Sequence, residues 1–336
     1  MTQLLGLVLV SFAVTSIFMV PFIDFLYYIK RRFQRFESDS KDHSDTPIHD
    51  SLMKGDESIP SGGGILLILI LMVLSLVFAF FSASANTSVL LILLLTLSLF
   101  GGLGLVDDIK LLLTKRKGKF LGLGRKEMLI IQIIFSLIIA SLLYFYLGLN
   151  NLYITGLGNF IIGWWYIPLA AFLIISFANA YNISDGLDGL SVGLLNICLF
   201  AFLALASATL DLTLASFIGI WIGTLFAYLY FNVWPARIFL GDAGAFGFGA
   251  TLAVVGLLTG KVLALGIIGG VYVIIVLSSL LQIASKKFLH KKLLPVAPLH
   301  MYFKYLGWEE PKIVARFWLA QALFAIFGLW MALLAK

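Results

Sequence analysis

The sequence predicts an all-α, polytopic integral membrane protein of about ten transmembrane helices, and three observations lead to that fold class. Hydrophobic residues make up 61% of the 336 residues, and the mean hydropathy is +1.05. Charged residues make up only 12%, whereas a soluble protein carries about 25%. Apolar stretches as long as a bilayer-crossing helix, about 20 residues, recur along the whole chain.

Ten such stretches are predicted to form one transmembrane domain, residues 1–336. They cover residues 2–29, 63–82, 88–106, 128–147, 161–181, 189–207, 213–231, 243–260, 262–285 and 313–335. The segment 30–62 is a polar loop, and the connection 148–160 is long enough for a short hairpin. The single cysteine, Cys198, lies in an apolar run, which excludes a disulfide within the chain and favours a core position.

The basic residues orient this bundle. All lysines and arginines except Lys261 and Lys336 fall in segments that share one side if ten helices cross the membrane. Because cytoplasmic loops carry the excess of Lys and Arg, we expect this side to be cytoplasmic and both termini to lie outside. No basic residue precedes the first apolar run, which favours a retained span over a signal peptide. The formal charge of +6 points to anionic lipids or substrates, and not to nucleic acid.

Carboxylates gather at this expected cytoplasmic side, from three separate connections: Asp107 and Asp108, Asp185 and Asp188, and Asp242. Clustered carboxylates repel one another unless a cation or nearby lysines compensate them. Mg²⁺ suits such a place, since it takes oxygen ligands, typically one or two carboxylates plus substrate phosphates. With the lysine-rich run 110–126, this combination favours phosphoryl transfer at the membrane edge. The chain has no GxxxxGK[ST] motif, which excludes a P-loop ATPase.

Each of these segments also has a purely structural interpretation. The pair in GLVDDIK would suit a membrane edge, and NAYNISDGLDGL would suit a polar turn with Asn182 and Asp185 as helix caps. Small-residue helix packing explains IFLGDAGAFGFGA. We interpret SIPSGGG, residues 58–64, as a plain turn, and His300 alone as an interfacial histidine. The occurrence of all the carboxylates on one face is what favours a site.

Five motifs together resemble those of the polyprenyl-phosphate N-acetylhexosamine-1-phosphate transferases, over nearly the whole chain. They are IPSGGG, GLVDDIK, NAYNISDGLDGL, FNVWPARIFLGDAGA and VAPLHMYFKYLGWEEPKIVARFW. The last is similar to the motif of the phospho-N-acetylmuramoyl-pentapeptide transferase branch. That resemblance implies a multi-pass enzyme of the bacterial inner membrane with a cytoplasmic active site, forming a homodimer among membrane lipids. It also implies a bent ninth helix, where Gly266, Gly269 and Gly270 would permit bending.

The implied reaction transfers the phospho-sugar of UDP-N-acetylmuramoyl-pentapeptide to undecaprenyl phosphate, giving lipid I and UMP with Mg²⁺. By the same resemblance, Asp107, Asp108, Asp242 and His300 are catalytic residues. Asp107 would deprotonate or position the lipid phosphate, and Asp242 would bind Mg²⁺. The substrate-binding set is Lys115, Asn182, Asp185, Gly186, Leu187, Asp188, Asn232, Phe239 and Gly241. Within it, Phe239 would stack on uracil and Lys115 would contact phosphate.

The chain also departs from the family pattern. The run His300-Met301-Tyr302 stands where the muramoyl branch usually has three histidines, and GDAGA replaces GDTGS beside Asp242. An enzyme that uses UDP-N-acetylglucosamine as donor is therefore an alternative. Alternatives of another class are an inactive membrane scaffold and an anion transporter, although a transporter predicts ionisable residues near the bilayer centre.

Overall fold

The computed structural model of the chain describes residues 2–34, 59–82, 85–117, 124–154 and 157–334, without the side chains of residues 33, 34, 110–117 and 125. Most of the polar loop expected over 30–62 thus lies outside the described residues. Within the described part, ten helices are long and apolar enough to cross a membrane. The predicted all-α membrane fold is confirmed.

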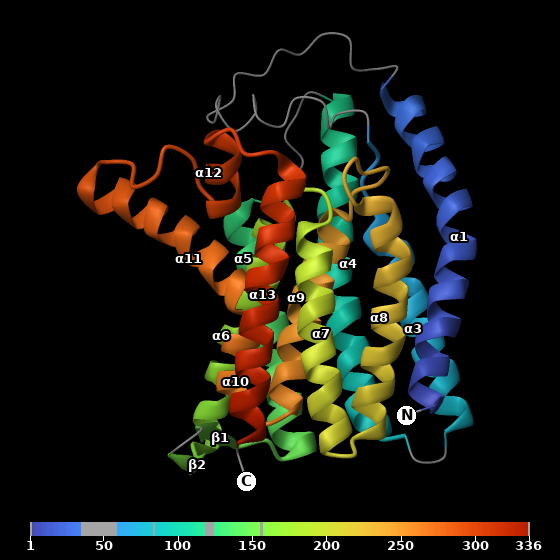
Figure 1. Cartoon of the computed structure of the whole chain (residues 1–336), viewed down its shortest axis with the longest axis vertical. Coiled ribbons are helices and arrows are strands. Elements are labelled where there is room, and N and C mark those ends of the chain that lie inside the picture. The colour runs from blue at the N-terminus through green and yellow to red at the C-terminus, as the bar shows by residue number, and fades with distance from the viewer. Residues whose placement is uncertain (1, 35–58, 83–84, 118–123, 155–156, 335–336) are drawn as a thin grey trace.

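The ten helices follow the predicted spans closely. They are α1 (Thr2–Gln34), α3 (Gly63–Phe81), α4 (Thr87–Lys117), α5 (Arg125–Leu147), α6 (Tyr166–Ser184), α7 (Leu190–Ala208), α8 (Leu212–Asn232), α9 (Gly241–Leu258), α11 (Gly270–Ala284), which a π-helical turn extends to Leu289, and α13 (Glu310–Leu333). Two short helices, α10 (Val262–Ile268) and α12 (Leu299–Tyr305), are the other α-helices among the described residues. In Figure 1, α1 begins and α13 ends at the same end of the bundle. The opposite end, where α9 begins and α12 lies, is called the site end below.

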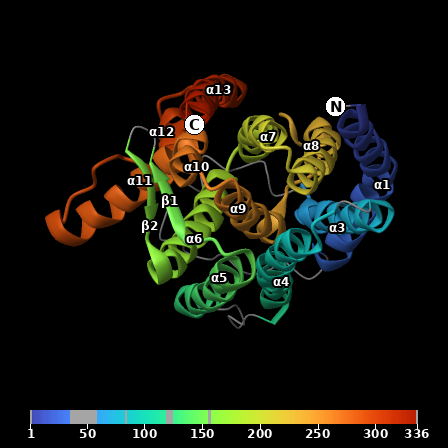
Figure 2. The same ribbon diagram turned by 90° about the horizontal axis from the view of Figure 1, so that it is seen from below.

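Helix α9 occupies the middle of the bundle, with α3, α4 and α6 packed against it (Figure 2). Glycines allow this close packing. A Cβ atom on Gly64 of α3 would lie 2.4 Å from the Cα atom of Gly244, and one on Gly104 of α4 would lie 2.1 Å from the carbonyl oxygen of Asp242. Membrane helices associate through such small residues because lipid gives them no hydrophobic driving force. The small-residue interpretation of 238–250 therefore holds for the helix interior.

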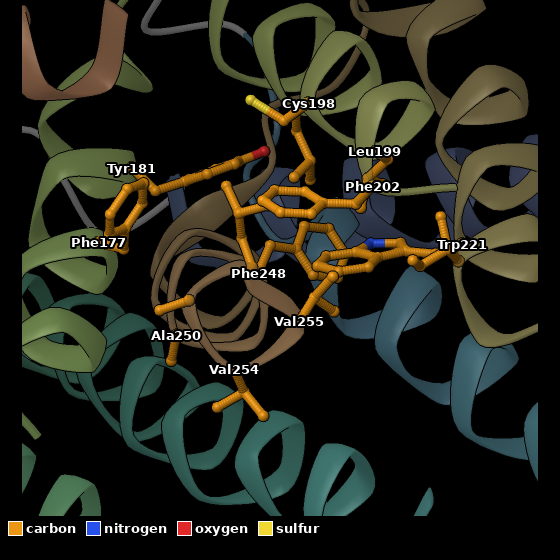
Figure 3. Packing of buried hydrophobic residues seen from close by; sticks show 14 of the residues in the cluster. Phe177, Tyr181, Cys198, Leu199, Phe202, Trp221, Phe248, Ala250, Val254 and Val255 are labelled. Carbon is orange, nitrogen blue, oxygen red and sulfur yellow. The ribbon is translucent and has the colours of Figure 1, made fainter. Parts of the chain in front are cut away.

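Aromatic rings fill the space on the other side of α9. The Phe248 ring lies between those of Tyr181 on α6 and Trp221 on α8, at centroid distances of 6.4 and 5.4 Å (Figure 3). All three side chains are buried, as is Cys198 nearby. The expected core position of Cys198 is thus confirmed, and α9 is held rigidly on several sides.

The ninth span is broken at Gly269 into α10 and α11, and Figure 1 shows α11 leaving the bundle at a steep angle. A Cβ atom on Gly269 would lie 2.5 Å from the ring of Phe177, and one on Gly270 would lie 2.7 Å from the ring of Phe324. Nothing lies within 4 Å of a Cβ on Gly266. The expected bend is confirmed, and packing requires glycine at Gly269 and Gly270 but not at Gly266.

A small antiparallel hairpin lies at the end of the bundle away from the site. Strands β1 (Asn151–Ile154) and β2 (Gly158–Ile161) pair Asn151 with Ile161, followed by the 3₁₀ turn Gly163–Trp165. The ammonium of Lys261 lies 3.8 Å from the ring centroid of Tyr153. This cation–π contact fastens the hairpin to the connection between α9 and α10. The short hairpin that the sequence predicts for the connection 148–160 is confirmed.

Two glycines of α4 offer a test of this packing. The substitution Gly104→Ala should destabilise the protein by about 1–3 kcal/mol, because its methyl group would collide with the backbone of α9. Since a Cβ on Gly102 meets nothing within 4 Å, Gly102→Ala should leave stability unchanged or raise it by about 0.5–1 kcal/mol. Fluorescence-detected thermal unfolding in detergent would compare the two variants, and equal melting temperatures would contradict the packing described for α9.

Candidate active site

The site end brings together the carboxylates of α4 and α9. The carboxylate of Asp108 accepts hydrogen bonds from the backbone amides of Asp242 and Ala243, each at 3.1 Å. These amides belong to the first turn of α9, where a helix leaves its N–H groups unpaired and carries partial positive charge. Asp108 therefore caps α9 from a neighbouring helix and fixes the backbone of Asp242 against α4.

The side chain of Asp242 is held by a different helix. Its Oδ1 atom accepts a hydrogen bond of 2.8 Å from the side-chain amide of Asn182, at the end of α6. The carboxyl group of Asp107 also lies within hydrogen-bonding range of that of Asp242. The structure thus brings Asp107, Asp108, Asn182 and Asp242 into one cluster, as the sequence predicts.

The interpretation of residues 58–64 as a plain turn is wrong for the described residues. The amides of Gly62 and Gly63 donate to the carbonyl oxygen of Phe239 at 3.1 and 2.9 Å, and the amide of Phe239 donates to the carbonyl of Pro60 at 2.9 Å. The entry to α3 is therefore paired with the entry to α9. The amides at the start of α3, which have no partner within that helix, are thus paired with the extended backbone that precedes α9.

Gly241 joins that paired segment to α9 and faces the cluster. Its φ angle is +82°, a left-handed conformation that glycine adopts without strain. A Cβ atom there would lie 3.0 Å from Oδ2 of Asp108 and 3.0 Å from the hydroxyl of Ser61. The side chain of Phe239, two residues earlier, is half-buried. Phe239, for which the resemblance implies a uracil contact, thus lies in the backbone segment that leads into the cluster.

Asp185 lies in the turn between α6 and α7 and is tied to the start of α7. The Ser191 hydroxyl donates to its Oδ1 atom at 2.5 Å, and the Tyr272 hydroxyl of α11 donates to the Ser191 carbonyl at 2.5 Å. Burial, together with the negative charges of Asp108 and Asp188, raises the pKa of Asp185 to about 6 against the opposing effect of the Ser191 hydrogen bond. Asp185 is thus a carboxyl group that titrates near neutrality.

Asp188 braces three segments of the site. Its Oδ2 atom accepts a 2.8 Å hydrogen bond from the amide of Ala236, and its own amide donates to Oε1 of Glu310 at 2.7 Å. The other carboxylate oxygen of Glu310 bonds the ammonium of Lys304 at 2.8 Å. Asp188 therefore joins the α6–α7 turn to the α8–α9 connection, and Glu310 joins that turn to α12.

Asn232 holds the same two connections from the end of α8. Its side-chain oxygen accepts from the amide of Gly189 at 3.2 Å, and its side-chain nitrogen donates to the carbonyl of Ile238 at 2.9 Å. Its side chain is 4% exposed. Asn232 therefore fixes the α6–α7 turn to the α8–α9 connection through backbone contacts, and the framing role that the resemblance implies stays a prediction.

His300 lies in α12 with a side chain that is 1% exposed. A Cβ atom on Gly186 would lie 2.9 Å from its Nε2 atom, so the imidazole packs on the backbone of the α6–α7 turn. Leu187 and Met301 are also buried. The Met301 side chain is thus packed in the protein interior, as is that of His300. Lys115 lies in the last turns of α4, where the side chains are outside the described part.

A cation at this site would depend on few protein ligands. The described residues contain no group of three or more His, Cys, Asp or Glu side chains arranged to hold a metal ion by themselves. Asp107 and Asp242 are the carboxylates of the cluster that accept neither a backbone amide nor a hydroxyl group in the contacts above. Such a donor set fits Mg²⁺, which usually combines one or two carboxylates with water and substrate phosphates.

Residues 90–260, which include every carboxylate of this cluster, match the model of glycosyl transferase family 4. This chain belongs to that family. The resemblance seen in the five motifs is thereby confirmed, and the fold described above is that of a family 4 enzyme.

Three similar proteins carry the same name. The chain is 33% identical to the phospho-N-acetylmuramoyl-pentapeptide-transferase of Oceanobacillus iheyensis over 339 aligned positions, which cover 98% of each chain. It is 36% identical to the transferase of that name from Bacillus subtilis, over 69% of this chain and 71% of the relative. The transferase of Geobacillus thermodenitrificans is likewise 36% identical, over 69% and 71%.

Three residues of this family 4 chain shape the site although the sequence did not single them out. Glu310 lies within the motif at the end of the chain, six residues after Lys304, and this acid close to a lysine was the signal that could have found it. Ser191 and Tyr272 hold Asp185 through hydroxyl groups in apolar helices. No spacing in the sequence distinguishes these two from ordinary small or aromatic residues.

The raised pKa of Asp185 predicts a pH effect on stability. Between about pH 4 and about pH 6 the folded protein holds a proton on Asp185 that the unfolded chain has released, so the free energy of unfolding falls as pH rises. Above this window the effect is complete. The melting temperature of the protein minus that of its Asp185→Asn variant should therefore decrease across the window and then level off. Melting curves that shift in parallel at every pH would contradict the raised pKa.

Proposed function

We propose that the protein transfers phospho-N-acetylmuramoyl-pentapeptide from its UDP-linked donor to undecaprenyl phosphate, giving lipid I and UMP. This is the first membrane step of peptidoglycan synthesis. The observation that carries the proposal is the cluster of Asp107, Asp108 and Asp242 at the site end, with Asn182 bonded to Asp242. The names of the family 4 relatives, one of which aligns over 98% of this chain, support this choice of reaction.

In this reaction a phosphate oxygen of undecaprenyl phosphate attacks the donor phosphorus that bears the sugar. A new pyrophosphate bond forms between lipid and sugar, and the bond to UMP breaks. Both reactants are anionic, so charge neutralisation and positioning supply most of the catalysis. One reactant is a lipid and the other is soluble, which fits a site at the end of the helices and not within the apolar middle.

Asp107 and Asp242 have the central roles in this proposal. Asp242 would hold Mg²⁺, which supplies positive charge to the donor phosphates when bound. Asn182 orients the Asp242 carboxylate for that purpose through its 2.8 Å hydrogen bond. Asp107, one residue before the capping Asp108, would position or deprotonate the lipid phosphate. Asp108 keeps both carboxylates in register by fixing α9 against α4.

The donor would lie between the α6–α7 turn, the α8–α9 connection and α12. Phe239 would stack on uracil, with Asn232 and Gly241 framing that pocket. Asp185, Gly186, Leu187 and Asp188 would shape the turn that faces the donor. His300 and Lys115 would face the phosphates.

We further propose that the site end faces the cytoplasm and both termini face outside, in a bacterial inner membrane. The excess of lysine and arginine at the site end supports this orientation. The enzyme would act as a homodimer surrounded by membrane lipids.

The test is UMP release by the purified protein in detergent with undecaprenyl phosphate and Mg²⁺. UDP-N-acetylmuramoyl-pentapeptide should be turned over, and UDP-N-acetylglucosamine should not. Turnover of UDP-N-acetylglucosamine alone would contradict the muramoyl donor and support the alternative, an enzyme that uses UDP-N-acetylglucosamine. Absence of UMP release with both donors, in protein with a normal melting curve, would favour an inactive scaffold. Removal of Mg²⁺ by a chelator should stop turnover, and added Mg²⁺ should restore it.

Asp242→Asn should lower turnover by about 100-fold or more, because it removes a charge that acts at the reacting phosphates. A matched control is Asp211→Asn at the opposite end of the bundle. Asp211 accepts a 2.9 Å hydrogen bond from the amide of Leu214 and caps α8, a role that asparagine fills equally well. Turnover of the Asp242 variant at the level of the control would remove Asp242 from the mechanism.

A further inference from the structure

The break between α10 and α11 leaves backbone groups that need partners inside the bundle. A helix end leaves its last carbonyl and first amide groups unpaired, and hydrocarbon offers no water to bind them. At this break the carbonyl of Ile268 ends α10 and the amide of Val271 lies in the first turn of α11. Both groups lie among buried side chains.

One side chain, Gln321 of α13, bonds both groups. Its Oε1 atom accepts from the amide of Val271 at 3.2 Å, and its Nε2 atom donates to the carbonyl of Ile268. The same nitrogen donates to the sulfur of Cys198 at 3.1 Å. Gln321 is 0% exposed and lies near the middle of α13. Its amide therefore replaces the helical hydrogen bonds that the break removes.

The direction of α11 is transmitted to the candidate active site by two contacts. In its first turn, the Tyr272 hydroxyl bonds the carbonyl of Ser191, whose own hydroxyl holds Asp185. Farther along, the Ser278 hydroxyl accepts a 3.0 Å hydrogen bond from the amide of Leu299, the residue before His300. A change in the angle of α11 would therefore displace Asp185 and His300.

We propose that Gln321 is a positioning residue, which sets the angle of α11 at the Gly269 break and thereby holds Asp185 and His300 in place. It touches no substrate. Its side chain pairs the backbone of both helices at once, so α11 has one favoured direction out of the bundle (Figure 1).

The direct test is a distance measurement that needs no substrate. Spin labels are attached through Leu289→Cys, beyond α11, and Tyr230→Cys, on α8; both side chains are exposed, at 68% and 79%. Cys198 is buried and stays unlabelled. In double electron–electron resonance, Gln321→Met should shift or broaden the distance distribution, because methionine has a similar length but forms neither hydrogen bond. An unchanged distribution would overturn the proposal.

Two further variants make the measurement specific. Gln132→Met makes the same change on α5, where Gln132 is 1% exposed and accepts a hydrogen bond only from Asn179 among the bonds described. It should leave the distance distribution unchanged, and an equal shift would show general loosening and not a role at the break. Gln321→Glu, kept neutral by burial, offers one donor and one acceptor and should restore the distribution. A distribution like that of Gln321→Met would contradict the hydrogen-bond basis.

The kinetic consequence rests on the proposed function. If the protein uses a UDP-linked donor, Gln321→Met should lower kcat/KM for that donor by about 100-fold, the effect of a misplacement of about 1 Å. Gln321→Glu should recover most of the lost kcat/KM, and Gln132→Met should leave kcat/KM unchanged. Because the spin-label distances need no turnover, failure of the proposed reaction and failure of the positioning role give different results.

Discussion

The hydrogen bonds from the start of α9 to the carboxylate of Asp108 are the constraint on which the rest of the site depends. They place a negative charge at the positive end of a helix. They also need the close approach of α4 and α9 that Gly104 allows. Once α9 is fixed in this way, Asp242 faces Asn182, and the segment before α9 is in reach of the glycines that begin α3.

The aspartates of the motifs consequently divide into two groups. Asp108 and Asp188 give their oxygens to backbone amides at the starts of neighbouring segments, and so hold the turns together. Asp107, Asp185 and Asp242 contact other side chains instead, and the charges of Asp107 and Asp242 lie close together. The backbone hydrogen bonds of Asp108 and Asp188 stabilise an arrangement that repulsion among the carboxylates opposes, including the repulsion of Asp108 with Asp242 and with Asp185. A cation bound with substrate phosphates would relieve that repulsion, which agrees with a site completed only when substrate is present.

The sequence predicts much of this fold because crossing a bilayer imposes a length and an apolarity that composition reveals directly. It also predicts which aspartates meet, since ten crossings put Asp107, Asp185 and Asp242 at one end. It did not predict the pairing of residues 59–64 with Phe239, because glycine amides carry no side-chain signal of their partner. Backbone amides likewise give no sequence signal for the partner of Asp108. The resemblance implies a catalytic role for Asp108 beside Asp107, whereas its hydrogen bonds to the α9 amides are seen only in the structure. The role of Gln321 likewise cannot be predicted from the sequence, because it depends on the position of this side chain beside the break at Gly269.

A comparison of Asp108→Asn with Asp107→Asn tests most directly the claim that one carboxylate builds the site and its neighbour acts in it. Asparagine at Asp108 offers one acceptor oxygen to two amides, so we expect a loss of about 1–3 kcal/mol in stability together with lost turnover. Asparagine at Asp107 removes a repulsion with Asp242, so we expect lost turnover without any loss of stability. Melting temperatures and UMP release would be measured on both proteins. Equal stability of the two variants, or a lower melting temperature for Asp107→Asn, would contradict the account.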